Sequence, residues 1–327
     1  MDENRRIAPE AGTSSRAPCD ITVVILTFNE ERHIARAIAS VRPIASDILV
    51  VDSFSSDATP EIAGSAGARV LQRRFINHSE QFQWALDHGE IDTAWTMRLD
   101  ADEVIEPDLA EEIQHRLPGL PADIAGVNFD RKHIFMGRWV RHGGRYPLRL
   151  LRLWRTGQGR IESRWMDEHM IVWGGGTVTF RGGFEDRNEN DLTFFTAKHN
   201  SYATREAIDV LSQRYGLLPS DEGLNAEASS RQAGVKRWFK EKVYNRLPLW
   251  AGPLLYFLYR YIFQLGFLDG RTGTIYHVLQ GFWYRYLVAC KIYEYDRQLR
   301  NCATREDRLA ALSQMTGYEL GNADAGR

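Results

Sequence analysis

Two aspartates one residue apart, Asp100 and Asp102, are the side chains of this sequence best suited to carry out chemistry. They belong to the run Arg-Leu-Asp-Ala-Asp-Glu at 98–103, which directly follows the strand-like apolar segment 95–97. Ligands of open parallel sheets bind beyond the carboxyl ends of the strands. Two carboxylates there would form an all-oxygen site for Mg²⁺ or Mn²⁺, and the metal could in turn hold a diphosphate. The alternative is a solvated loop that caps the next helix, near Pro107.

Strand-like and helix-like segments alternate through the first half of the chain. The pattern predicts strands at 21–26, 47–51 and 69–71, and helices at 31–41, at 60–66 and around Gln81. Such alternation predicts an α/β fold with a mostly parallel sheet flanked by helices on both faces. The loops after the first, second and fourth strands would then share one edge of the sheet. The polar residues that this edge would carry are Asn29, Glu30, Asp52, Asp100 and Asp102.

No glycine-rich phosphate loop follows the first strand, neither Gly-x-Gly-x-x-Gly nor Gly-x-x-x-x-Gly-Lys. We therefore expect metal and arginine to bind phosphate. After the third predicted strand, Arg73, Arg74, His78 and Gln81 are candidates to line a donor pocket. Asp52 could accept hydrogen bonds from a ribose or a base edge, or it could cap its own serine-rich loop.

Composition limits the class of protein. The chain has 327 residues, 43% of them hydrophobic, and a formal net charge of -2, which excludes a broadly basic nucleic-acid-binding protein. Its three cysteines form no Cys-x-x-Cys pair, which fits a reducing cytosol. Residues 1–19 lack the apolar core of a signal peptide and are predicted to be a disordered lead-in, with no secretion implied.

Three motifs in order resemble the signatures of family 2 glycosyltransferases, which have the GT-A fold. They are Thr-Phe-Asn-Glu-Glu at 27–31, Val-Val-Asp-Ser-Phe-Ser-Ser-Asp-Ala-Thr at 50–59, and the run at 98–103. The resemblance covers residues 20–200. It continues through 267–270 and 281–285, which are similar to the tail of bacterial lipopolysaccharide core and exopolysaccharide enzymes.

The resemblance implies a nucleotide-sugar donor, most commonly a UDP-sugar in this family, and a bound Mg²⁺ or Mn²⁺. It implies that Asp52 contacts the nucleotide and that Asp102, with Asp100, contacts the metal. The other residues expected to bind the nucleotide-sugar are Thr27, Asn29, Glu30, Ser53, Gln81, Arg98 and Asp100.

An inverting transfer needs a general base to deprotonate the acceptor hydroxyl. The family carries a carboxylate in the region of residues 165–169, which read Trp-Met-Asp-Glu-His. Relatives with a His-Glu pair there imply Glu168, whereas a one-residue shift of the alignment would imply Asp167. His169 is a candidate third metal ligand or orienting partner, with a purely structural histidine as the alternative.

Two later segments are rich in basic and aromatic residues. Residues 131–160 hold nine Arg or Lys and no Asp or Glu, which suits phosphate groups and sugar rings or, alternatively, a solvated face. Residues 231–246 are basic, and 247–268 are strongly apolar, although Arg260 would fit badly at the centre of a bilayer. We expect a basic, aromatic platform that lies on an anionic leaflet. The alternative is a helical pair packed on the catalytic domain or forming a dimer.

These features predict a catalytic domain at 20–205, a helical membrane- or acceptor-associated region at 206–300 and a polar tail at 301–327. The leading hypothesis is a metal-dependent, inverting glycosyltransferase that acts on a lipid-linked saccharide at the cytoplasmic face of a bacterial membrane. One alternative makes polyprenyl phosphate itself the acceptor, so that no hydroxyl-activating base is needed. The others are a sugar nucleotidyltransferase, which would release pyrophosphate, and a non-catalytic membrane scaffold.

Overall fold

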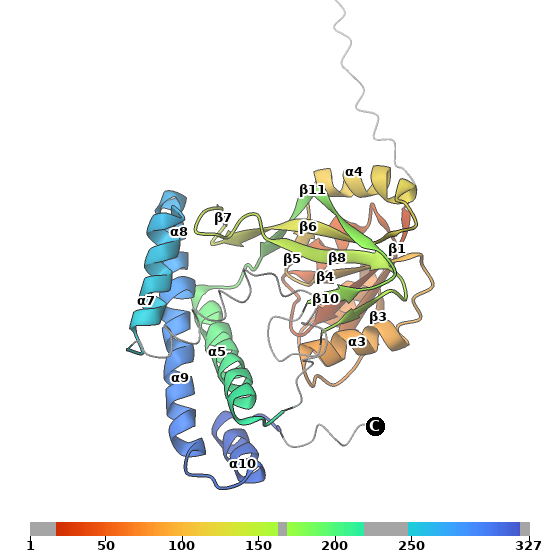
Figure 1. The fold of residues 1–327 in the computed structure, drawn as a ribbon. Helices are drawn as coiled ribbons and strands as arrows, with labels where there is room; N and C mark the ends of the chain where they lie inside the picture. The colour runs from red at the N-terminus through yellow and green to blue at the C-terminus, as the bar shows by residue number, and fades with distance from the viewer. Residues whose placement is uncertain (1–17, 163–168, 219–247, 321–327) are drawn as a thin grey trace, which may run out of the picture.

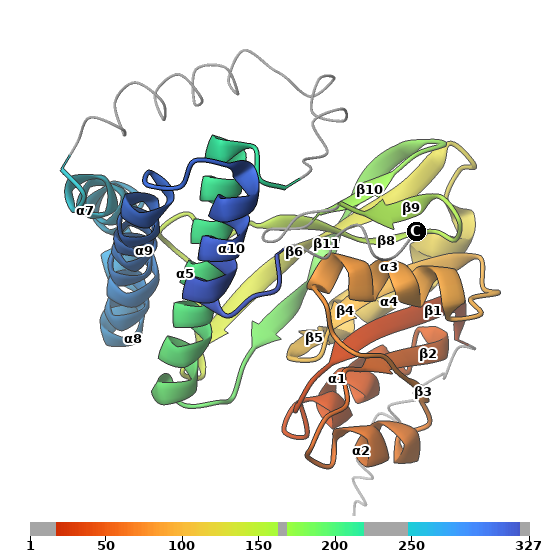
Figure 2. The ribbon, with the colours of Figure 1, turned by 90° about the horizontal axis from the view of Figure 1, so that it is seen from below.

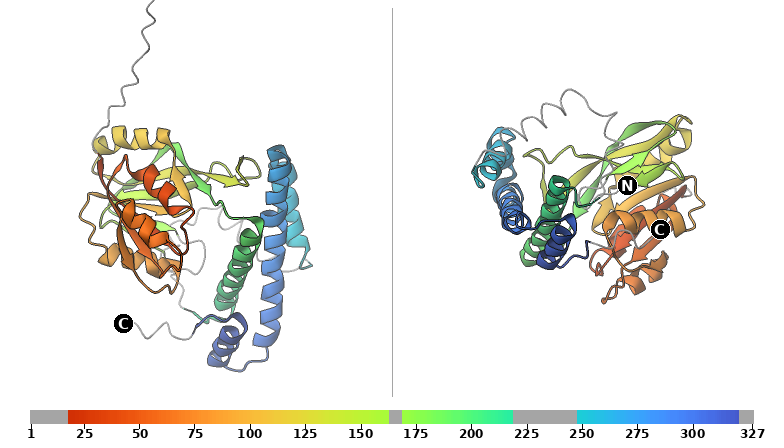
Figure 3. Two further views of the ribbon diagram at one scale, coloured as in Figure 1. Left: turned by 180° about the vertical axis from the view of Figure 1, so that it is seen from behind. Right: turned by 60° about the horizontal axis from the view of Figure 1, so that its bottom comes forward.

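The computed structural model describes residues 18–162, 169–218 and 248–320. Within them, a sheet domain lies beside a unit of long helices (Figures 1, 2 and 3). Three predictions fall wholly or largely outside the described residues: the lead-in at 1–19, the basic run at 231–246, and the two candidate bases Asp167 and Glu168.

The first half of the sheet is parallel, in the order β3-β2-β1-β4. Buried apolar residues alternate between its two faces, as in β1, where Val23 packs with helices α1, α2 and α4 and Val24 packs with α3. The predicted alternation of strands and helices, with both faces covered, is thus confirmed. The elements are β1 (Cys19–Thr27), α1 (Ile34–Val41), β2 (Ala45–Asp52), α2 (Thr59–Ser65), β3 (Arg69–Gln72), α3 (His78–His88), β4 (Trp95–Asp100) and α4 (Pro107–Arg116).

The second half makes the sheet a mixed one. Strand β8 is antiparallel to β4 and β6, β11 is parallel to β6, and β5 closes the far edge antiparallel to β11. A mixed α/β sheet flanked by helices, followed by a helical C-terminal region, confirms the predicted GT-A-type fold class. The mostly parallel character holds for the first four strands. The added elements are β5 (Glu103–Ile105), η1 (Leu117–Gly119), β6 (Ile124–Phe135), β7 (Arg138–Val140), β8 (Arg149–Arg155), β9 (Gly159–Ile161), β10 (Met170–Val172) and β11 (Gly176–Arg187).

In the helical unit, α5 packs along α9, with α10 at one end (Figure 1). Apolar residues of all three helices form its core, among them Leu211, Leu299 and Leu312. The predicted polar tail therefore contributes a packed helix, which begins with a capping box between Thr304 and Asp307. The elements are α5 (Leu192–Tyr215), α7 (Ala251–Leu258), η4 (Tyr259–Phe263), η5 (Gly266–Asp269), α8 (Gly270–Tyr276), η6 (His277–Trp283), α9 (Tyr284–Leu299) and α10 (Arg305–Thr316).

Polar contacts join the helical unit to the loop after β7. The Arg260 guanidinium is buried and donates from Nε to the Gly143 carbonyl at 2.6 Å. Asp269 accepts hydrogen bonds from the backbone N–H groups of Arg141 and His142. The helices are therefore packed on the sheet domain, and Arg260, the charge least compatible with a bilayer, faces protein. Among the described helices, none combines the length and the apolarity needed to cross a membrane.

Candidate functional site

The loop after β2 is organised by Asp52, which ends that strand and is fully buried. Its carboxylate accepts hydrogen bonds from Thr27 Oγ1 at 3.0 Å, from the Ser55 N–H at 2.8 Å and from Gln72 Nε2 at 3.4 Å. These donors occupy both carboxylate oxygens. Of the two roles considered for Asp52, the structure shows the capping of its own loop, and nucleotide contact stays a prediction.

The loop after β1 is tied to the same serine-rich loop through Asn29. Asn29 adopts a left-handed backbone conformation, with φ of 56°. Its side-chain Oδ1 accepts a hydrogen bond from the Ser56 N–H at 2.8 Å, and its own N–H donates to Ser55 Oγ at 2.8 Å. Next to it, the Glu30 N–H donates to Thr59 Oγ1 at 2.8 Å. The two loops thus form one cross-linked unit at the carboxyl edge of the sheet.

Gln81 on α3 is buried and reaches the same edge. Its Nε2 donates to Ser53 Oγ at 3.2 Å and to the Arg73 carbonyl at 3.3 Å, while its Oε1 is buried without a partner. The predicted donor-binding residues from three different loops are therefore brought together by these contacts.

Asp100 is held between two arginines. Its Oδ1 lies 3.2 Å from Arg98 Nε, and its Oδ2 lies 3.4 Å from Arg152 Nη2. Burial favours the neutral acid, but the two guanidiniums lower the pKa of Asp100 well below its usual range. Glu103 shares Arg152 at 2.5 Å, and burial there raises the pKa of Glu103 to about 8. Arg152 was not identified as a site residue from the sequence; the only signal was the basic run at 131–160.

Asp102 has different partners. Its Oδ2 accepts a hydrogen bond from Asn188 Nδ2 at 3.0 Å and lies 3.8 Å from Lys198 Nζ on α5. Burial disfavours the charged form of Lys198, but the Asp102 carboxylate raises the pKa of Lys198. Because its partners are one amide and one ammonium at long range, the Asp102 carboxylate keeps capacity for a further ligand.

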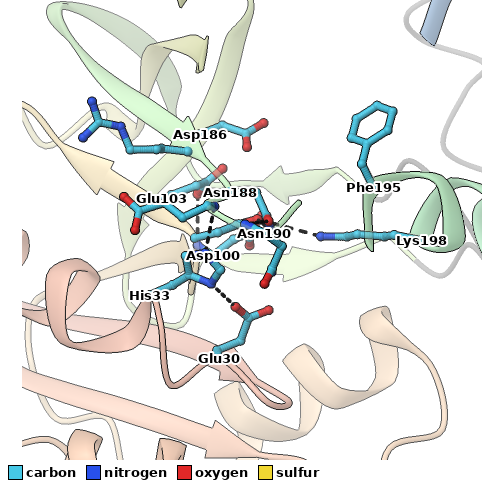
Figure 4. Close-up of polar contacts among 12 residues, drawn as sticks. Glu30, His33, Asp100, Glu103, Asp186, Asn188, Asn190, Phe195 and Lys198 are labelled. Atoms are coloured by element: carbon cyan, nitrogen blue, oxygen red, sulfur yellow. Dashed lines mark hydrogen bonds and ion pairs between the residues drawn. The ribbon is translucent and has the colours of Figure 1, made fainter. Parts of the chain in front are cut away.

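The loop that carries Asn188 is anchored to the first loop of the sheet. The Glu189 N–H donates to His33 Nε2 at 2.9 Å, and His33 Nδ1 lies 2.6 Å from Glu30 Oε2 (Figure 4). The imidazole therefore accepts at Nε2 and donates from Nδ1. Glu30, predicted to bind the donor, thus also positions the wall beside Asp102.

A cavity of about 390 Å³ lies between the sheet domain and the helical unit. Asp100, Asp102 and Glu103 line it from the sheet, and Lys198, Tyr202 and Arg285 line it from helices α5 and α9. The predicted metal-site carboxylates and Lys198 of α5 therefore share one cavity. Thr27, Asn29, Asp52 and Gln81 do not line it.

His133 and Asp186 also line this cavity, and no local pattern in the sequence indicates them. They are register partners on the parallel strands β6 and β11, and His133 Nδ1 lies 3.0 Å from an Asp186 carboxylate oxygen. Although Asp186 is buried, His133 and Arg131 lower its pKa. A pair fifty-three residues apart in sequence becomes visible only once the strand pairing is known.

The chemistry of Asp102 suits a hard cation, since its ligands would be oxygen atoms. Within the described ranges, no group of three or more His, Cys, Asp or Glu side chains is placed to hold a metal. His169 is exposed and lies 3.6 Å from Glu162 rather than joining Asp100 and Asp102. Asp102 is thus a described carboxylate that could contribute oxygen ligands to a Mg²⁺ or Mn²⁺, and metal binding stays a prediction.

The site thus consists of paired aspartates at the carboxyl edge of an α/β sheet, where they line a cavity. Residues 22–187, just over half of the chain, match the model of the family described as glycosyl transferase family 2. The chain belongs to this family, which confirms the resemblance carried by its three motifs.

Curated relatives match a shorter segment. Uncharacterized glycosyltransferases of Rickettsia typhi and Rickettsia bellii are 38% and 39% identical over 95 residues, which is 29% of this chain and 32% of each relative. The matched segment thus spans about a third of their length.

Solved structures show weak likeness. Mannosyl-3-phosphoglycerate synthase from Rubrobacter xylanophilus is 15% identical, with a TM-score of 0.38 over 64% of this chain and 80% of that one. TarS residues 1–349 from S. aureus is 13% identical, with a TM-score of 0.42 over 94% and 92%. Both scores are too low to assign a substrate.

Proposed function

We propose that this protein is an inverting glycosyltransferase that transfers a sugar from a nucleotide-sugar donor to a lipid-linked saccharide. The reaction would take place at the cytoplasmic face of the cytoplasmic membrane, in the synthesis of lipopolysaccharide or exopolysaccharide. The observation that carries the proposal is the cavity in which Asp102 of a family 2 domain meets helices with an exposed apolar surface.

The donor end of the site would lie at the carboxyl edge of the sheet. The cross-linked loops at Asn29 and Asp52 would present the nucleotide, with a UDP-sugar as the expected donor. Asp102, with Asp100 beside it, would hold a Mg²⁺ or Mn²⁺. When bound, such a cation stabilises the charge of the departing diphosphate. Lys198, 3.8 Å from Asp102, would add a second positive charge for that phosphate.

The acceptor end would use the aromatic wall contributed by the helical unit. Tyr202, Tyr276 and Tyr284 line the cavity and offer rings suited to stack on sugars. Glu168 remains our candidate general base, with Asp167 as its alternative. Both belong to the stretch between Glu162 and His169, and neither is among the described residues.

The helical unit carries an exposed apolar surface, which we define as the exposed large hydrophobic residues between 249 and 293. It contains 14 of the 22 such side chains found in the described part of the chain. Phe263 is the most exposed, at 77%, whereas Arg260 nearby is buried against Gly143. A surface with exposed apolar side chains and a buried arginine suits insertion into the headgroup region of a membrane. It would bring a membrane-held acceptor to the cavity.

The test is the release of nucleoside diphosphate from a panel of nucleotide-sugars, with Mn²⁺ or Mg²⁺ and a Gram-negative lipid extract as the acceptor. We expect Asp102→Asn and Glu168→Gln each to lower the rate at least tenfold, about 1.4 kcal/mol of transition-state stabilisation. Asp92→Asn, which alters an exposed carboxylate just before the start of β4, is the matched control.

Full activity in Glu168→Gln with loss in Asp102→Asn would move the base to Asp167 or favour a phosphate acceptor. Release of pyrophosphate instead would identify a nucleotidyltransferase. No release and no nucleotide binding by the folded wild type would refute the transferase and leave the scaffold.

A further inference from the structure

Arg145 is a cavity-lining guanidinium without an anionic partner among the described residues. It follows two glycines of left-handed backbone conformation, Gly143 and Gly144, and its side chain lies over the Tyr276 ring at 5.4 Å. Its Nε is buried and makes no hydrogen bond. In the described part of the chain, no carboxylate comes within ion-pair distance of Arg145.

Other positive charges surround this position. Burial lowers the pKa of Arg145, and the neighbouring guanidiniums of Arg131 and Arg260 act in the same direction. Arg260 also has a buried nitrogen, Nη2, without a partner, and its one hydrogen bond among the described residues goes to the Gly143 carbonyl. Two adjacent guanidiniums thus have buried N–H groups that no described protein group satisfies.

The nearby carboxylates are engaged elsewhere. Asp186 pairs with His133 at 3.0 Å and with Arg131 at 3.5 Å. Glu206 accepts from Tyr284 at 2.6 Å and from Arg285 at 2.7 Å. Asp186 still raises the pKa of Arg145 from a distance, but neither carboxylate forms an ion pair with Arg145.

Arg145 as a whole is half-buried, but a buried N–H group such as its Nε is costly when no hydrogen-bonding group pairs with it. The guanidinium fork matches the oxygens of phosphate and carboxylate groups, and phosphate adds a stronger charge. The cavity thus holds Asp102, which we propose binds a cation, and separately Arg145, which forms no ion pair with a described residue. This arrangement suits a second anionic group, distinct from the diphosphate at the cation.

We infer that Arg145 binds a phosphate group of the acceptor. The inference rests on the proposed function and adds the chemical class of the acceptor: a phosphorylated saccharide or a lipid phosphate. The apolar surface reaches the wall of the cavity: the Tyr256 ring of that surface lies 5.5 Å from the guanidinium of Arg260 and 5.7 Å from that of Arg285, which lines the cavity.

Isothermal titration of the full chain with two phosphates and their uncharged counterparts tests the inference. The probes are farnesyl phosphate and farnesol, below their micelle thresholds, and glucose 1-phosphate and glucose. We expect at least one phosphate to bind and its uncharged counterpart to bind at least tenfold more weakly. Arg145→Gln should weaken that phosphate at least tenfold. Arg138→Gln, which removes an exposed arginine on β7, should change it less than twofold.

Binding of farnesyl phosphate alone would identify a lipid headgroup, and binding of glucose 1-phosphate alone a phosphorylated saccharide; either supports the inference. Equal binding by the Arg145→Gln and Arg138→Gln variants, or equal binding of a phosphate and its uncharged counterpart, overturns it. If Arg145→Gln does not fold, as judged by circular dichroism, Arg145→Lys is titrated in its place. A parallel titration of the wild type with UDP and Mn²⁺ separates the two ideas: UDP binding without phosphate binding overturns only the inference about Arg145.

Discussion

At the scale of single residues, the two aspartates of one motif have different surroundings. Asp100 is neutralised by Arg98 and Arg152, whereas Asp102 meets Asn188 and the more distant Lys198. Asp100 therefore holds the end of β4 in place, and Asp102 is the carboxylate available to a ligand. Two carboxylates of one sequence motif thus differ in how strongly protein cations pair with them.

This difference predicts different effects on stability. Asp100→Asn removes the charge that balances two buried guanidiniums, so the free energy of unfolding should fall by about 1–2 kcal/mol, a figure reduced for the partial exposure of Asp100. Asp102→Asn should cost less, about 0.5 kcal/mol, because it breaks only the longer pair with Lys198 at 3.8 Å. Urea unfolding of both variants measures the difference, and equal losses would contradict this prediction.

Asp52 gives a second prediction at this scale. In Asp52→Asn one carboxylate oxygen becomes an amide NH2. Facing the Ser55 N–H it would set a donor against a donor, and facing Thr27 it would force the hydroxyl to turn and accept, while the negative charge at this buried position is lost in either case. We expect a loss of about 1–3 kcal/mol of unfolding free energy. The comparison is Asp92→Asn, whose carboxylate is exposed. If unfolding in urea is the same for Asp52→Asn and wild type, Asp52 does not organise the loop.

At the scale of elements, the junction between the sheet domain and the helical unit depends on a buried histidine. His277 begins η6, lies 3.4 Å from Asp269 and packs closely on Gly143, where an added Cβ would come within 2.2 Å of the imidazole. Glycine is needed there both for this approach and for the left-handed backbone. Burial, with Arg260 nearby, lowers the pKa of His277 to about 4.

The shifted pKa predicts acid sensitivity. Between pH 6.5 and 4 the unfolded chain binds a proton at residue 277 and the folded chain does not, so stability falls as the pH is lowered through this window. The loss attributable to His277 is about 2 kcal/mol at pH 5 relative to pH 8. His277→Gln should flatten the pH dependence of urea unfolding by that amount.

Because other buried histidines act in the same direction, the exposed His115→Gln is the reference. The same slope in both variants would contradict the assignment to His277.

At the scale of the whole molecule, one side of the helical unit packs on the sheet domain and closes the cavity, while the apolar surface stays exposed. Both interpretations considered for this region, packed helices and a membrane platform, are thus compatible with one arrangement. The packing is observed, and the platform is our proposal. Its consequence is that membrane binding and acceptor access would be coupled through α7 to α9.

The platform predicts binding to vesicles of phosphatidylethanolamine and phosphatidylglycerol. Phe263→Ser with Leu268→Ser should weaken binding at least tenfold, because partial burial of two such side chains in lipid contributes about 1.5 kcal/mol or more. The control is Ile76→Ser, which removes an apolar side chain, 59% exposed, from the sheet domain. It should change vesicle binding less than twofold. Cosedimentation measures all three proteins, and indistinguishable binding would argue against the platform.

The sequence alone determined the parallel strands, their covering helices and the edge at which Asp52, Asp100 and Asp102 lie. It could do so because apolar periodicity and strand ends are local properties of the chain. The three motifs likewise sufficed to identify the family.

Only the tertiary structure decided which partners each charge has. Arg152 pairs with Asp100 from fifty-two residues away, and Arg260 turns to Gly143 across one hundred and seventeen. Such contacts depend on strand order and helix docking, which no local pattern records. The same long-range packing joins Asp102 and Arg145 in one cavity, because α5 and α9 close a space that the sheet domain alone leaves open.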